Sequence, residues 1–427
     1  MKIINFFKRK KFKSITEFFF FVLISIFFRF RFLIIAEIIS LIAIRFIFRP
    51  ININHLLSQI YHQKRNYEKE RKYFKKYLLD NLKIKKVEPQ MLAEYFLICS
   101  YCKNKRDIKI FLKYSIKNSS VYFYGIGLLR YLENESDFKN YFSKSIKIFF
   151  NDKKKEIPNY IKMIINFETK YNYKKNYNQI NIKKLNFLDK DQIRIENYYK
   201  SKEPIVLVGS DYTYFKIFYS HYVKLFFETN NNYLHFHLFL KNKKELIRLS
   251  DIKLLNNNIL ISYEYIKKKN FPTSITIDRF KICYYILRKL KKDVMLTDID
   301  LNPNFSLKNI SKKIIKQDCK FGFVDEKFGV PWAKYAAGFC YFTKKDKIVL
   351  SFLSTLINFF DKKRQNQMFW TVDQTGLFLV SHLYKKNINF KILNLNNHVN
   401  FQKMLDTPWY LQRKKIKSKM TLIKKEK

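Results

Sequence analysis

The first strongly patterned stretch of the chain is an almost continuous apolar run over residues 18–48. Its longest uncharged part, residues 18–28, is shorter than the roughly 20 residues that a helix needs to cross about 30 Å of hydrocarbon. Charges flank and interrupt the run, namely Lys8, Arg9, Lys10, Lys11, Lys13, Arg29, Arg31, Glu37 and Arg45. We expect residues 1–50 to contact a membrane, either as one or two imperfect spans or as a helix lying in the interface. A pair of helices buried in a soluble protein is the alternative.

The pattern over residues 51–170 is helical. Apolar side chains recur at the spacing of one helix face, for example at Leu92, Tyr95, Phe96 and Cys99. Short polar turns separate several such stretches. This predicts an all-α region, either a bundle or repeat-like, with nothing catalytic in its composition. The lysine- and asparagine-rich stretch that follows favours a linker over residues 171–201.

From residue 202 the period changes, and short apolar strands alternate with helices. Strands are expected at 205–208, 235–240, 259–261 and 294–297, and a helix at 274–290. This alternation predicts an α/β domain over 202–427 with a mostly parallel sheet, whose ligands bind at the carboxyl ends of the strands. Asp211 follows the first strand, and Asp298 and Asp300 follow the fourth.

The amino-acid composition limits the kinds of molecule that this chain is expected to bind. The formal net charge is +49, but lysine outnumbers arginine and is spread along the whole chain. That distribution argues against a specific nucleic-acid partner, while it suits anionic membranes and phosphate-bearing substrates. Five cysteines, an odd number, favour a reducing compartment.

The pair Asp298 and Asp300 carries the chemistry. Two carboxylates one residue apart at the end of a strand can hold Mn²⁺ or Mg²⁺, which prefer oxygen ligands. Such a pair alone is a weak signal, because acidic residues also cap turns. Haloacid-dehalogenase phosphatases use the same pair with the first Asp as nucleophile, but they expect Thr or Val where this chain has Asn302. A metal phosphohydrolase therefore stays an alternative, as does a non-catalytic basic scaffold that binds membranes or nucleic acid.

The order of motifs from about residue 203 to 384 resembles that of GT-A-fold glycosyltransferases, especially the family 8-like nucleotide-diphospho-sugar transferases. The residues that carry the resemblance are Val208-Gly209-Ser210-Asp211, Arg279-Phe280, Val294-Met295-Leu296-Thr297-Asp298-Ile299-Asp300, Tyr335-Ala336-Ala337-Gly338-Phe339 and Trp370-Thr371-Val372-Asp373-Gln374. The resemblance implies a GT-A-like domain that takes a sugar from a nucleotide-sugar donor.

The resemblance also implies roles for single residues. Asp298 and Asp300 would bind the metal, with His398 as a third ligand, although the Lys-Pro-Trp that usually follows this histidine is absent. Asp211, Tyr212, Arg279 and Gly338 would contact the donor, while Asp373 and Gln374 would face the sugar and acceptor. The expected acceptor is a glycan or glycolipid, and the expected location is the cytoplasmic face of a bacterial inner membrane.

Overall fold

The computed structural model describes residues 15–29, 32–46, 51–83, 87–152, 157–167, 184–188, 192–250, 252, 254–266, 271–326, 329–344, 346–365, 371–408, 410–411 and 414. The chain divides into two compact units. The first consists of Met1–Thr169 with Phe328–Val330, and the second of Lys170–Lys327 with Pro331–Lys427. Each is described here by itself.

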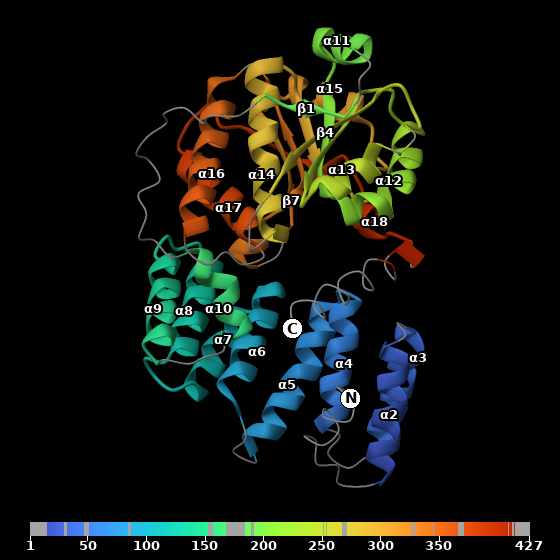
Figure 1. The fold of residues 1–427 in the computed structure, drawn as a ribbon. Helices are drawn as coiled ribbons and strands as arrows, with labels where there is room; N and C mark the ends of the chain where they lie inside the picture. The colour runs from blue at the N-terminus through green and yellow to red at the C-terminus, as the bar shows by residue number, and fades with distance from the viewer. Residues whose placement is uncertain are drawn as a thin grey trace. The chain divides into compact units, whose positions relative to one another are not determined.

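The first unit is helical throughout its described part, as the sequence pattern predicts (Figure 1). Its longer helices are α2 (Ile15–Arg29), α3 (Leu33–Phe46), α4 (Ile51–Gln63), α5 (Tyr67–Lys83), α6 (Pro89–Tyr101), α7 (Lys105–Phe111), α8 (Ser120–Leu132), α9 (Phe138–Asn151) and α10 (Asn159–Ile164). Consecutive helices pack as neighbours, most closely α4 with α5 and α8 with α9. Side-chain caps begin two of them: Asn104 accepts a hydrogen bond from the Asp107 N–H before α7, and Ser119 accepts one from the Tyr122 N–H before α8.

The apolar segment near the N-terminus forms the pair α2 and α3, which packs on α4 through one apolar cluster. Part of the segment, residues 1–14, 30–31 and 47–50, lies outside the described residues. Within the part of the chain that the structure describes, no helix is both long enough and apolar enough to cross a bilayer. The membrane contact expected for this segment stays a prediction.

The second unit is built on a mixed sheet that contains eight strands in its described residues. In spatial order these are β1 (Asn186–Phe187), β4 (Ile259–Tyr265), β3 (Leu234–Leu240), β2 (Ile205–Asp211), β5 (Val294–Thr297), β7 (Tyr335–Phe342), β6 (Phe321–Asp325) and β8 (Ile392–Asn394). The core from β4 to β5 is parallel, as expected, and β6 pairs parallel with β8. By contrast β1 and β7 run antiparallel to their neighbours.

Helices cover both faces of this sheet (Figure 1). The helix α12 (Tyr212–Phe227) packs with α15 (Leu307–Lys316) into the cluster that includes Val206 and Val208 of β2. The helices α14 (Phe271–Tyr285), α16 (Lys347–Gln365) and α17 (Val372–Tyr384) pack together on the other face. Gly209 lies against α14 there, as the alternation of side chains along a strand requires. A short helix, α13 (Lys243–Ser250), packs on β3.

Residues 171–201, expected to be a linker, contribute to this unit where they are described. The strand β1 pairs antiparallel with β4, and the helix α11 (Gln192–Lys200) carries the fully buried Tyr198. Residues 171–183 and 189–191 lie outside the described residues. The periodicity of so short a strand and helix is too brief to stand out from a lysine- and asparagine-rich background.

The strand order creates one distinctive place on the sheet. The chain moves outward from β2 to β3 and β4, and then returns to place β5 on the opposite side of β2. Where the connections leave two adjacent parallel strands in opposite directions, a crevice forms outside their carboxyl ends, and ligands of open α/β sheets bind there. In this unit that place is the carboxyl ends of β2 and β5.

Candidate functional site

Asp211 is the last residue of β2 and also the N-cap of α12. Its carboxylate accepts a hydrogen bond from the Tyr214 N–H at 2.8 Å, which satisfies one of the unpaired amides of the first turn. Burial raises the pKa of Asp211 above its ordinary value, although the backbone hydrogen bond opposes this. Asp211 therefore caps α12, and this hydrogen bond holds its carboxylate at the carboxyl edge of the sheet.

Asp298 and Asp300 directly follow β5, which lies beside β2. The two strands are in parallel register, with Val208 opposite Thr297, so Asp211 and the acidic pair leave the sheet at the same edge. The phenol of Tyr214 shows that they converge. Burial raises the pKa of Tyr214 far above its usual range, and the nearby negative charges of Asp300, Asp211 and Asp298 raise it further. Three carboxylates therefore lie close enough to one tyrosine to act on its charge, at the edge where β2 and β5 end.

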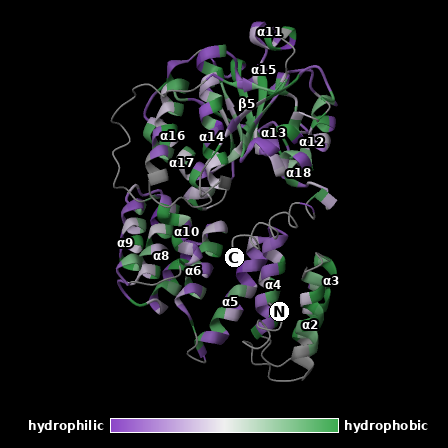
Figure 2. Cartoon of the chain, viewed as in Figure 1, coloured by the Kyte–Doolittle hydropathy of each residue, from purple (hydrophilic) through white to green (hydrophobic). Residues whose placement is uncertain are grey.

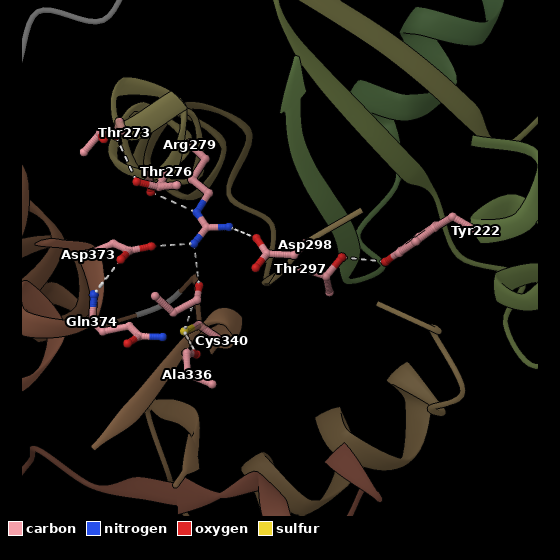
Figure 3. A network of polar contacts seen from close by, with 11 residues as sticks. Tyr222, Thr273, Thr276, Arg279, Thr297, Asp298, Ala336, Cys340, Asp373 and Gln374 are labelled. Atoms are coloured by element: carbon pink, nitrogen blue, oxygen red, sulfur yellow. Dashed lines mark hydrogen bonds and ion pairs between the residues drawn. The ribbon is translucent and has the colours of Figure 1, made fainter. Parts of the chain in front are cut away.

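Arg279 of α14 ties two of the acidic residues together (Figure 3). One terminal nitrogen of its guanidinium donates to Asp298 Oδ1, and the other donates at 3.0 Å to Asp373 Oδ2 and at 3.0 Å to the Ala337 carbonyl. The Nε–H donates to the Thr276 carbonyl at 2.9 Å. The arginine is 2% exposed. These hydrogen bonds place Arg279 between the carboxylates of Asp298 and Asp373, and a contact with a donor phosphate stays a prediction.

One guanidinium is shared by two carboxylates in this group, the buried Asp373 and the partly exposed Asp298. Burial works against the charged form of Arg279, but Asp298 and Asp373 raise the pKa of its guanidinium above the ordinary value. Burial raises the pKa of Asp373, and Arg279 opposes that shift. Removing one partner from the buried Arg279–Asp373 pair would leave an uncompensated charge, which costs about 3–5 kcal/mol. The three side chains are thus a single unit that fixes Asp298 in place.

Two glycines permit this close arrangement. A Cβ at Gly338 of β7 would fall on the carboxylate of Asp298, and the Gly338 carbonyl accepts the Asp298 N–H at 2.9 Å. A Cβ at Gly209 of β2 would lie 2.8 Å from the Cβ of Arg279. Both contacts are shorter than real side chains allow, so the backbone can approach the charged groups only because these residues are glycines.

Asp373 and Gln374 begin α17 after an unusual residue. Thr371, the N-cap of that helix, has φ of 86°, a left-handed conformation that is strained for a β-branched side chain. The second carboxylate oxygen of Asp373 accepts the Gln374 N–H at 2.9 Å. The Gln374 side chain is half-buried. Backbone strain of this kind concentrates at functional sites, and here it stands two residues before the aspartate held by Arg279.

The remaining residues expected from the sequence are less clearly placed. Tyr212, the first residue of α12, is half-buried and packs against the core cluster. His398 is exposed and follows β8 at the far end of the sheet order. Among the described residues there is no group of three or more His, Cys, Asp or Glu side chains arranged to hold a metal ion. The role of His398 as a third metal ligand stays a prediction.

Sequence reasoning gave no role to the residues that brace the loop after Asp300. The Asn302 amide nitrogen donates to the Asp406 carbonyl at 2.6 Å, its oxygen lies 2.9 Å from His221 Nε2, and its backbone N–H donates to the Met404 carbonyl at 2.7 Å. Asn302 was visible in the sequence only as a departure from the phosphatase motif. Its partners lie 81 and more than 100 positions away, which no local pattern reveals.

Comparison with known proteins adds little. A solved structure that resembles part of this chain is that of mouse xyloside xylosyltransferase 1 in its apo form, with a TM-score of 0.31 and 8% sequence identity over 48% of this chain and 94% of that one. A TM-score of this size carries no inference about fold or function. No protein-family model and no curated protein matches the sequence.

Proposed function

We propose that the second unit is a glycosyltransferase that moves a sugar from a nucleoside-diphosphate donor to a glycan or glycolipid acceptor. The observation that carries the proposal is the convergence of Asp211, Asp298 and Asp300 at the carboxyl ends of β2 and β5. A cluster of carboxylates at the place where open α/β sheets bind ligands suits a diphosphate substrate accompanied by a divalent cation.

The residues present fit Mn²⁺ or Mg²⁺. Asp298 and Asp300 offer the oxygen atoms that these hard cations prefer. The Asp298 side chain is 41% exposed although Arg279, at 3%, holds one of its oxygens from the buried side. Mg²⁺ commonly takes one or two protein carboxylates and completes its shell with substrate phosphates and water, so a third protein ligand is not required. When bound, the metal would neutralise charge on the departing diphosphate.

The other residues of the site supply position and shape. Arg279 holds Asp298 in one rotamer, a pre-organisation that metal sites draw from the groups behind their ligands. Asp211 and Tyr212 stand at the β2 end, suited to the base and ribose of the donor. Gly338 lets the β7 backbone come close to the site. Asp373 and Gln374 are assigned to the sugar and acceptor side, with the Asp373 carboxylate retaining acceptor capacity beyond its two hydrogen bonds.

The geometry disfavours the phosphohydrolase alternative. That chemistry needs Asp298 as a free nucleophile, whereas Arg279 binds its Oδ1 with a charge-assisted hydrogen bond. A carboxylate oxygen held in this way is a weaker nucleophile, but it remains a good scaffold for a metal ligand. Nothing in the described residues favours the scaffold alternative over catalysis.

The test is a panel of sugar nucleotides incubated with the full chain, with and without Mn²⁺, with the released nucleotide as readout. We expect metal-dependent release that falls on the order of 10²-fold or more in Asp300→Asn, because a ligand charge is lost at nearly unchanged size. Asp318→Asn, an exposed aspartate with two lysine partners, is the matched control and should retain full release.

The same panel separates the alternatives. Hydrolysis of simple phosphate esters that depends on Asp298 would identify a phosphohydrolase instead. Full metal-dependent release by Asp300→Asn would remove the metal role from this pair, and no turnover with any sugar nucleotide would leave the proposal without support.

A further inference from the structure

Among its described side chains, the helix α3 presents a row of large apolar residues to solvent. The large aliphatic residues in this row include Ile34, which is 67% exposed, and Ile38, at 52%. Ile35, Leu41 and Ile42 are exposed as well. The exposed residues recur at the spacing of one helical face. On the neighbouring helix α2, Phe19 and Ile26 are also exposed. Figure 2 shows both helices hydrophobic along most of their length.

The opposite side of α3 packs against the rest of the protein. Its buried positions are the small residues Ala36, Ser40 and Ala43, which let α2 and α4 approach closely. The acidic residue of the helix also faces this side, since Glu37 accepts hydrogen bonds from Tyr61 of α4 at 2.6 Å and from Lys64. The ion pair with Lys64 and the Tyr61 hydrogen bond lower the pKa of Glu37 against the opposing effect of burial. Glu37, one of the charges that interrupt the apolar segment, is therefore paired within the protein.

An exposed surface of this kind on a soluble protein normally marks an interaction site. Electrostatic charge distinguishes two partners that could cover this surface, a second copy of the chain and a lipid bilayer. A second copy of the chain would bring another +49 formal charges, whose mutual repulsion opposes association. An anionic bilayer has the opposite sign. The cations Lys8, Arg9, Lys10, Lys11 and Lys13 precede Ile15, the first residue of α2, by only a few positions in the chain. The net charge of the chain therefore favours the bilayer over a second copy.

We propose that the exposed face of α3, with the adjoining side chains of α2, docks onto the surface of an anionic lipid bilayer. The aliphatic side chains enter the interface, while Glu37 stays paired on the protein side with Tyr61 and Lys64. The cationic chain is attracted to the acidic headgroups. The inference rests on the first unit alone and does not depend on sugar transfer. It would place a membrane-bound acceptor within reach of the same chain.

The test is flotation of the full chain with vesicles of phosphatidylglycerol and phosphatidylcholine in equal amounts, compared with vesicles of phosphatidylcholine alone. The test variant is the triple substitution Ile34→Ser, Ile38→Ser and Ile42→Ser. We expect it to weaken partitioning into the mixed vesicles by about a hundredfold, because each isoleucine loses the apolar area that it would bury. The changed positions are exposed, so folding is preserved.

The matched control makes the same three changes elsewhere, as Ile116→Ser, Ile315→Ser and Ile388→Ser. These isoleucines are at least as exposed, at 77%, 72% and 86%. The control should partition like the unchanged chain, and binding of both should weaken with salt and on neutral vesicles. Equal partitioning of the test variant and the control would overturn the proposal. So would equal binding to neutral and anionic vesicles. Light scattering that shows a dimer, broken only by the α3 substitutions, would instead assign the face to a second copy.

Discussion

At the scale of single residues, the candidate site depends on two glycines, which lack side chains, as much as on its charged residues. The sequence has only seven glycines, and two of them, Gly209 and Gly338, lie against Arg279 and Asp298. Sequence reasoning gave Gly338 the role of letting the backbone approach the donor sugar. The structure shows that what it approaches most closely is the carboxylate of Asp298. The spacing between β7 and that carboxylate is therefore set by the absence of a side chain.

Gly338→Ala is expected to displace the Asp298 carboxylate and break its ion pair with Arg279. Metal-dependent nucleotide release should fall on the order of 10²-fold, with a stability cost of about 1–3 kcal/mol for the overpacking. Gly376→Ala is the control, since its Cβ would press only on side chains of α16, at 2.8 Å from Phe360. Urea unfolding and the release assay together check the prediction. Comparable losses of release in both variants would show that stability, not the position of Asp298, limits activity.

Lys292 is a buried lysine that should make stability depend on pH. Its side chain is fully buried beside the Tyr198 ring, and its amino group donates to the Ser201 carbonyl. Burial, with a smaller contribution from Lys344, lowers the pKa of Lys292 to about 8. The unfolded chain holds this proton up to about pH 10.4, so it binds more protons than the folded state between these two values.

The free energy of unfolding should therefore gain a contribution from Lys292 as pH rises from about 8 to about 10. In Lys292→Met that rise should disappear, and the variant should be the more stable protein near neutral pH. Urea midpoints of both proteins at intervals across this range measure the difference. A difference between them that does not change with pH would contradict the lowered pKa.

At the scale of elements, one aspartate joins three helices of the first unit. Asp107 of α7 accepts hydrogen bonds from Arg71 at 2.6 Å and Lys75 at 2.9 Å, both of α5, and from Tyr95 of α6 at 2.7 Å. It is 4% exposed. Because burial alone would penalise the carboxylate, these partners are what hold its pKa below the ordinary value. The arrangement fixes how α5, α6 and α7 meet.

Asp107→Ala should destabilise the first unit by about 2–4 kcal/mol, since it leaves a buried tyrosine hydroxyl and two cations without their shared acceptor. Glu68→Ala removes the other acidic partner of Arg71, but Glu68 is 65% exposed, and its loss should cost under about 1 kcal/mol. Chemical unfolding followed by far-ultraviolet circular dichroism tests the difference. Equal costs for the two variants would mean that the Asp107 cluster contributes no more than a surface pair.

At the scale of the whole molecule, the division into two units predicts how a substrate would stabilise the chain. We expect two unfolding transitions on heating, one for each unit. Mn²⁺ together with a nucleoside diphosphate should raise only the transition of the second unit, by about 2.7 kcal/mol at a hundredfold excess over the dissociation constant. Calorimetry measures both transitions. The increase should vanish with a chelator and in Asp300→Asn, and an increase that persisted in that variant would place the metal elsewhere.

Much of the local structure follows from the sequence alone. The apolar run Val294–Thr297 is a strand with the expected bounds, and the helix expected at 274–290 is α14 with a π-helical continuation over Ile286–Leu290. These elements are predictable because the period of apolar residues reports which backbone geometry buries them. The placement of Asp211, Asp298 and Asp300 at the ends of strands follows from the same local pattern.

The tertiary structure alone decided what those residues meet. The pairing of β5 with β2 brings Asp298 toward Asp211 across 87 positions of chain, and Arg279 reaches Asp373 across 94. Periodicity could not show that Arg279 is buried between two aspartates, that Gly338 touches one of them, or that Glu37 turns away from the apolar face of α3. Such facts depend on strand order and on which helix packs against which. Hydrophobic burial determines that a face is covered, but the partner that covers it is chosen only when the whole chain folds.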